Sequence, residues 1–235
     1  MNKRLLLLEY DAGYVETFDK ISEKFLVESK KDTGELSKNG VPLVVFAVLQ
    51  KYGVLNENNR IYSEALLKRE ADRYLKYCIP QKNTLLEANH PESTQINILN
   101  GAGLLIDCWW EGITLLGKIK LNVSKGFIDS GIVSTSGDHI ANLMMNDVRV
   151  GVSSRGVGSL KKQNNVNIVQ DDYELLCWDF VNKPSSKGSW VSNDLKTLEP
   201  FIDKNIKETI QNNNQTDIAD RLSNFLERFK WFSNM

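Results

Sequence analysis

An uninterrupted apolar run at residues 43–49 (LVVFAVL) constrains the fold of this chain more than any other feature. The run is rich in β-branched residues and follows Pro42. Such a run predicts a strand that is buried on both faces. Structure must therefore cover both sides of that strand, and 235 residues, 41% of them hydrophobic, suffice for one large domain with a real core.

Shorter patterns predict the other elements. Apolar residues at three- and four-residue intervals predict an amphipathic helix that begins after Ser63 and ends before Pro80. Two strand-like runs joined by Glu111-Gly112 predict a hairpin at 103–121. We also expect a helix at 138–147, strands at 148–154 and 173–181, and between these strands a Lys/Asn-rich turn at 161–165.

The character of the chain changes after Pro184. Residues 195–210 are predicted to be helical, 211–215 form a polar linker, and 216–232 form a second amphipathic helix. We therefore place a domain boundary near residue 192, with a domain at 1–192 and a helical appendage at 193–235. The last helix either packs back on the domain or docks on a partner.

Composition excludes several classes of protein. The balance of 29 basic and 30 acidic residues gives a net charge of -1, which disfavours nucleic acid as a partner. The apolar run at residues 5–8 is too short for a membrane span and lacks the cleavage site of a secretory signal. Cys78, Cys108 and Cys177 are an odd number at wide spacings with no C-x-x-C pair, and histidines are few, so we expect reduced, buried thiols in a cytosolic protein and no metal.

Three residues are candidates for chemistry. His90 precedes Pro91, which holds its backbone extended, so the imidazole can be aimed, whereas His139 lies on a predicted helix. Ser153 is expected on the face of its strand opposite the valines, although a plain Ser/Gly turn explains it equally well and a bulge would exchange it with Ser154. Asp179 is expected to be buried, so it needs a cationic partner or an imidazole.

The partner of Asp179 is expected to be Arg149, Arg155 or the imidazole of His90. With Ser153, these residue types match the base, nucleophile and orienting acid of a hydrolytic triad. The segment that contains Ser153, residues 150–159, is neither a G-x-S-x-G elbow nor a phosphate-binding loop. It lacks the second glycine of the elbow and the lysine of the loop.

The resemblance that the sequence carries is to a known family of viral proteases. Five strings in order resemble the prohead maturation proteases of contractile-tailed bacteriophages over roughly residues 54–191: NENNRIY (56–62), EANHP (87–91), WWEG (109–112), GVSSRGVG (151–158) and DFVNKPS (179–185). The resemblance implies an α+β fold, mainly an antiparallel β-barrel surrounded by helices, as in the herpesvirus capsid maturation protease. It also implies a serine endopeptidase with His90 as base, Ser153 as nucleophile, and Asp179, or failing that His139, as third member.

Further expectations concern the substrate. Backbone amides near Arg155 and Gly156, beside Ser154, would stabilise the oxyanion, and the side chain of Arg155 would bind a substrate glutamate. The resemblance implies that the enzyme cuts capsid and scaffold core proteins, and itself, after glutamate in Leu/Ile-x-Glu contexts inside the prohead in the bacterial cytoplasm. In this chain such contexts occur at residues 26–28 and 206–208. The mechanism needs no cofactor, nucleic acid or membrane, and a homo-oligomer is left open.

Two rival functions remain at this point. A non-enzymatic capsid-core scaffold component would use the Ser/Gly segment as a turn and the helices for assembly. The second rival is a hydrolase with Cys177 as nucleophile. An ordinary structural role as a core thiol explains Cys177 without such a function.

Overall fold

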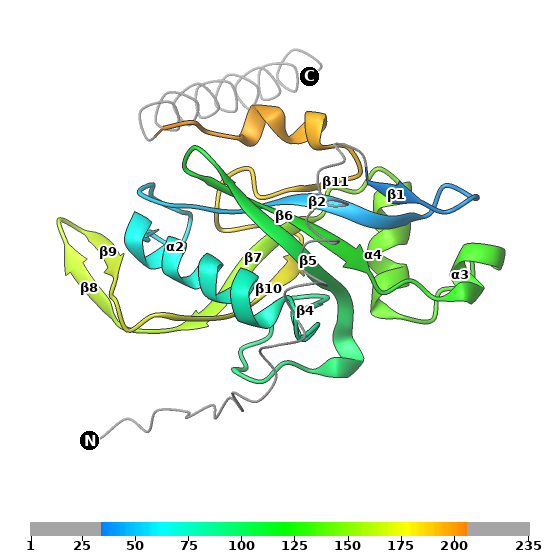
Figure 1. The fold of residues 1–235 in the computed structure, drawn as a ribbon, viewed down its shortest axis with the longest axis horizontal. Coiled ribbons are helices and arrows are strands. Elements are labelled where there is room, and N and C mark those ends of the chain that lie inside the picture. Colours follow the sequence, from blue (N-terminus) through cyan, green and yellow to red (C-terminus); the bar gives the residue numbers. More distant parts are fainter. Residues whose placement is uncertain (1–33, 206–235) are drawn as a thin grey trace, which may run out of the picture. The chain divides into compact units, whose positions relative to one another are not determined.

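The computed structural model describes residues 34–205 (Figure 1). The largest sheet has the order β1-β2-β6-β5-β4 and is antiparallel throughout, with β11 also paired to β2. Its strands are β1 (Glu35–Leu36), β2 (Pro42–Lys51), β4 (Leu85–Glu87), β5 (Gly101–Glu111), β6 (Thr114–Leu121) and β11 (Val191–Ser192). β2 is buried along almost its whole length, which confirms the strand predicted from the apolar run. Within the described residues, no helix has the length and apolar character needed to cross a membrane.

Two smaller sheets complete the strand structure. β7 (Gly151–Val157) pairs antiparallel with β10 (Glu174–Val181), and β9 (Val166–Val169) lies between β3 (Arg60–Ile61) and β8 (Leu160–Gln163). The turn expected at 161–165 is mostly strand, since β8 and β9 form a hairpin around Asn164 and Asn165. Both asparagines have positive φ, 48° and 64°, as a tight two-residue hairpin turn requires.

The helices predicted after Ser63 and near residues 138–147 are present. The Ser63 hydroxyl accepts the N–H of Leu66 at 3.2 Å and begins α2 (Glu64–Arg73), which continues as a π-helical turn (Tyr74–Cys78). The chain then forms α3 (Lys125–Ser130) and α4 (Ser136–Met145), and the latter begins at a capping box on Thr135. In Figure 1, α2 lies on one side of the central strands, away from α3 and α4.

The sheets are connected by two isolated bridges. Ala88 bridges to Phe180 of β10, and Gly151 bridges to Trp190 just before β11. The mainly antiparallel, mixed α and β character is as expected. The described strands form three separate sheets and no closed barrel, so the barrel expected from the resemblance is not confirmed.

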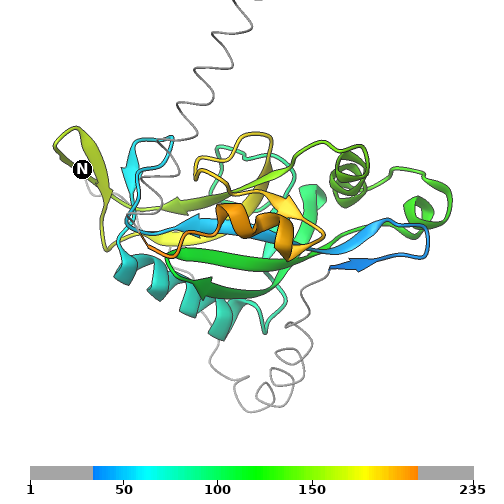
Figure 2. The same cartoon turned by 90° about the horizontal axis from the view of Figure 1, so that it is seen from above.

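The segment assigned to the appendage packs on the sheet. Residues Leu195–Phe201 form a 3-10 helix that contains Pro200, shorter than the helix predicted to run to 210. Leu198 is buried with Phe46, Val48 and Leu116, and Figure 2 shows this segment (orange) lying across the central strands. The domain boundary near residue 192 stays a prediction. The predicted linker at 211–215, the helix at 216–232 and both Leu/Ile-x-Glu contexts lie outside the described residues.

Candidate active site

His90 and Asp179, far apart in the sequence, are in direct contact. Nδ1 of His90 lies 2.7 Å from Oδ2 of Asp179. An ionised carboxylate can only accept a hydrogen bond, so Nδ1 carries the proton of the neutral imidazole and Nε2 is the basic nitrogen. The His90 side chain is 38% exposed, whereas that of Asp179 is fully buried. The pair has the arrangement of a general base that is oriented from behind and reached from solvent.

Backbone contacts hold His90 in this position. Ala88 bridges to Phe180, and the N–H of Asn89 donates to the carbonyl of Phe180 at 2.9 Å. Asn89 has a φ of 76°, in the left-handed region that asparagine tolerates better than most residues. Because Phe180 follows Asp179 directly, these contacts place the His90 segment beside the carboxylate.

The buried carboxylate of Asp179 is saturated with donors. Nε of Arg155 lies 3.0 Å from Oδ2 and its Nη2 lies 3.1 Å from Oδ1. The backbone N–H of Glu87 donates to Oδ1 at 3.3 Å. Burying a carboxylate without such partners would be very costly. Of the two expected cationic partners, the structure confirms Arg155, while the guanidinium of Arg149 lies 5.1 Å from the ring centroid of Trp190.

Arg155 also binds a second carboxylate. Its Nη2 lies 2.6 Å from Oε1 of Glu87, and its Nη1 donates to the carbonyl of Ser93 at 2.9 Å. Burial disfavours the charged guanidinium, but the hydrogen bond to Glu87, the interaction with Cys177 and the charge of Asp179 outweigh it and raise the Arg155 pKa above its ordinary value. Because the side chain is only 6% exposed, this placement argues against the expected contact with a substrate glutamate.

Ser153 lies directly opposite Asp179 in the β7–β10 pairing. Val150 and Val152 pack in the core, so alternation along β7 directs the side chain of Ser153 to the other face. Arg155, two residues along, reaches Asp179 from that same face. The predicted separation of Ser153 from the valine face is therefore confirmed.

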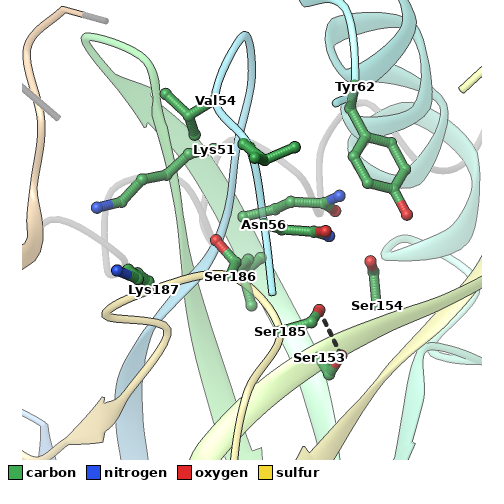
Figure 3. A pocket seen from close by; sticks show the side chains of 12 residues that line it. Lys51, Val54, Asn56, Tyr62, Ser153, Ser154, Ser185, Ser186 and Lys187 are labelled. Atoms are coloured by element: carbon green, nitrogen blue, oxygen red, sulfur yellow. Dashed lines mark hydrogen bonds between the residues drawn. The ribbon is translucent and has the colours of Figure 1, made fainter. Parts of the chain in front are cut away.

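The hydroxyl of Ser153 contacts that of Ser185, with an Oγ–Oγ distance of 3.4 Å (Figure 3). Ser185 follows Pro184, which packs closely on Gly151: a Cβ at position 151 would lie 2.7 Å from Cδ of Pro184. Glycine thus lets this segment approach β7. Among the described residues no hydrogen bond joins Ser153 to His90. Asp179 links the two, because it contacts His90 and is paired with Ser153 across the strands.

The outer edge of β7 presents backbone amides next to Ser153. The N–H of Val152 donates to the carbonyl of Ser189 at 2.8 Å, on the side away from β10. Backbone groups alternate along a strand, so the N–H groups of Ser154 and Gly156 also point away from β10. The N–H of Arg155 points toward β10, which makes it unsuitable as the oxyanion donor that the sequence suggested.

A small pocket with both polar and apolar lining lies beside Ser153 (Figure 3). Oδ1 of Asn56 accepts the N–H groups of Asn58 and Arg60, which leaves the amide NH₂ of Asn56 as a donor. Oε1 of Gln50 is buried without a hydrogen-bond partner. The pocket is lined by Leu49, Gln50, Lys51, Val54, Leu55, Asn56, Tyr62, Ser153, Ser154, Ser185, Ser186 and Lys187.

Comparison with protein families decides the relationship. A family model described as prohead core protein serine protease matches residues 7–199. The chain belongs to this family. A member from Enterobacteria phage T4, the prohead core protein protease, is 30% identical over 152 residues, which cover 64% of this chain and 68% of that protein. A solved structure of the bacteriophage T4 capsid assembly protease matches with a TM-score of 0.55 at 24% identity and covers 63% of this chain and 88% of its own, which supports the fold.

For a prohead core protein serine protease, the arrangement distinguishes Asp179 from His139 as the partner of His90. Asp179 contacts His90 and faces Ser153, whereas His139 is exposed on α4. Burial, followed by the nearby charge of Asp179, raises the pKa of the Cys177 thiol to about 12, so Cys177 makes a poor nucleophile. All three cysteines are free and buried, as predicted.

Sequence reasoning missed two residues of this site. Glu87 stands in the string that carries His90, and the need to balance a buried arginine between two carboxylates could have indicated it. Ser185 stands in the string that carries Asp179, but nothing in its spacing indicates that it would contact Ser153. Both contacts join residues that are far apart in the sequence, so they depend on how the chain folds.

Proposed function

We propose that this chain is a serine endopeptidase of phage prohead maturation, with Ser153 as nucleophile, His90 as general base and Asp179 as the residue that orients and stabilises the imidazolium. The observation that carries the proposal is the 2.7 Å contact between Nδ1 of His90 and Oδ2 of Asp179, directly across the strand pair from Ser153. Membership of the prohead core protein serine protease family supports the same chemistry.

In the proposed reaction, the hydroxyl of Ser153 turns from Ser185 toward Nε2 of His90. Catalytic hydrogen bonds are often long or unformed until substrate binds. His90 takes the proton, Ser153 Oγ attacks the scissile carbonyl, and the protonated imidazole then gives its proton to the leaving amine. Water, activated by the same imidazole, hydrolyses the acyl-enzyme and restores the hydroxyl.

The developing oxyanion would bind the outward N–H group of Ser154, whereas that of Gly156 lies about 6.6 Å further along the strand and cannot reach the same oxygen. Donors that are already fixed in place need no reorganisation as the charge develops. Gly156 has no room for a side chain, since a Cβ there would lie 2.5 Å from the hydroxyl oxygen of Tyr173. The close packing keeps this part of β7 in one position.

The proposed substrates are capsid and scaffold core proteins and the enzyme itself, within the assembling prohead in the bacterial cytoplasm. The T4 relatives are described as a prohead core protease and a capsid assembly protease, which supports this class of substrate. Cleavage after glutamate in Leu/Ile-x-Glu contexts is part of the proposal, including Glu28 and Glu208 of this chain. Hydroxyl and amide groups in the pocket beside Ser153 could receive such a carboxylate. The bridges that connect the sheets support a distorted barrel like that of the herpesvirus capsid maturation protease.

Incubation with a candidate scaffold protein tests the proposal. Wild type should cut it after glutamate, as read by mass, whereas Ser153→Ala and His90→Ala should lower turnover by roughly four to six orders of magnitude. Ser130→Ala and His139→Ala alter exposed residues and serve as matched controls. Ordinary cleavage by folded Ser153→Ala would refute the assignment.

A further inference from the structure

Glu87 and Arg155 form a buried charge pair behind the His90–Asp179 contact. Glu87 ends β4 and is 0% exposed, and Arg155 comes from β7 and is 6% exposed. The guanidinium binds Oε1 of Glu87 at 2.6 Å and both oxygens of Asp179 at 3.0 and 3.1 Å. One planar cation thus spans two carboxylates from different strands, a fork geometry that lysine cannot reproduce.

Stability alone does not explain this arrangement. Buried ion pairs are often replaceable by apolar residues without loss of stability, because the desolvation of both charges offsets their attraction. Here the second oxygen of Glu87, Oε2, is buried without a hydrogen-bond partner. An unpaired oxygen on a buried carboxylate needs an explanation, and a role in catalysis is one.

The charges of the cluster do not cancel. Glu87 and Asp179 carry one negative charge each and Arg155 one positive charge, which leaves a net charge of -1 beside His90. Cys177 of β10 also faces the carboxylate of Asp179. Burial raises the pKa of the Cys177 thiol, which therefore stays neutral. Removing the charge of Glu87 would therefore leave a neutral cluster beside His90, and a neutral cluster favours the imidazolium less than a negative one.

We propose that Glu87 and Arg155 are positioning residues of the catalytic site: Arg155 fixes the direction of the Asp179 carboxylate, and Glu87 sets the net charge that His90 meets when it takes a proton. The inference rests on the proposed function, in which His90 is the general base. The two effects can be tested separately. The guanidinium of Arg155 orients the Asp179 carboxylate, whereas the net charge depends on Glu87, Arg155 and Asp179 together.

Four variants of the full-length chain distinguish the two effects, measured as kcat and as the acid limb of the pH profile of kcat/KM. Glu87→Gln neutralises the cluster and should move the acid limb about one unit to lower pH. Glu87→Asp keeps the charge and should leave the limb in place. The double variant Glu87→Gln/Arg155→Met restores a net charge of -1, so its limb should return to the wild-type position, while its kcat should fall because the fork of Arg155 is lost.

Arg155→Lys keeps the charge but loses the fork. Its acid limb should match wild type, and its kcat should fall about 10- to 100-fold because Asp179 no longer holds the imidazole in one direction. A merely structural role would lower the amount of folded enzyme in each variant and leave every acid limb where it is. Circular dichroism of each variant separates misfolding from altered chemistry.

The outcomes also separate this inference from the function on which it rests. A wild-type enzyme that cleaves no substrate, or a Ser153→Ala variant that cleaves normally, overturns the proposed function. An active, Ser153-dependent enzyme whose acid limb is unmoved in Glu87→Gln, or whose kcat is unchanged in Arg155→Lys, overturns the inference alone.

Discussion

Replacing Asp203 by asparagine should destabilise the folded unit by about 3–5 kcal/mol, because it leaves a buried ammonium without its carboxylate. Nζ of Lys51 lies 2.7 Å from Oδ2 of Asp203, and the two side chains are 6% and 3% exposed. Asparagine keeps the shape of the residue and its backbone bonds, in which the N–H of Asp203 donates to the Thr114 hydroxyl and its carbonyl accepts the N–H of Ile113. The charge is therefore the main quantity that changes.

Urea and thermal unfolding followed by circular dichroism measure this effect. At roughly 2–4 °C per kcal/mol for a chain of this size, the predicted loss corresponds to a Tm lower by about 6–20 °C. The double variant Lys51→Met/Asp203→Leu removes both charges and should recover most of the loss. Lys68→Ala, which removes an exposed ion pair with Glu64, should leave the midpoint within experimental scatter. An Asp203→Asn protein within about 1 kcal/mol of wild type would refute the reasoning.

Three further predictions concern the active site. Ser185→Ala should not lower kcat, because in the proposed reaction the Ser153 hydroxyl leaves that of Ser185 to reach His90, and a kcat that falls tenfold in stopped assays would contradict this. Gly151→Ala should cost about 1–3 kcal/mol in a urea titration and slow acylation, since the new Cβ forces Pro184 away from β7; a fully stable, fully active variant would show that the close packing is unimportant. The raised pKa of Cys177, about 12, means that at pH 8 only about one thiol in 10⁴ is ionised, so iodoacetamide should neither modify it nor inactivate the folded enzyme; rapid alkylation of Cys177 seen by mass would contradict this.

Local patterns were sufficient to predict much of the fold. The apolar run at 43–49, the cap at Ser63 and the Gly112 turn act within a few residues, so β2, α2 and the β5–β6 hairpin could be predicted from sequence. The hairpin at 160–169 was missed because both of its strands have only four residues and β8 is exposed and mostly polar. The helix expected after Leu195 is a short 3-10 helix that ends at Phe201 and packs on the sheet, which the sequence pattern does not reveal.

The site could be predicted only in part, for a physical reason. A histidine held before Pro91, a serine off the valine face and a buried carboxylate each leave a mark on their own segment of sequence. Arg155 was expected to bind either Asp179 or a substrate glutamate, because sequence alone does not show that its guanidinium bridges two buried carboxylates from β4 and β10. Contacts between distant strands depend on their pairing, which no single segment encodes.

Labelling with a serine-directed phosphonate tests the central claim most directly. The reagent reacts only with an activated hydroxyl, so peptide mapping of the full-length chain should find a single adduct on Ser153. His90→Ala and Asp179→Asn should slow that labelling by orders of magnitude, while the control His139→Ala should label at the wild-type rate. An adduct on another serine, or a wild-type protein that stays unlabelled while remaining folded, would contradict the triad proposed here.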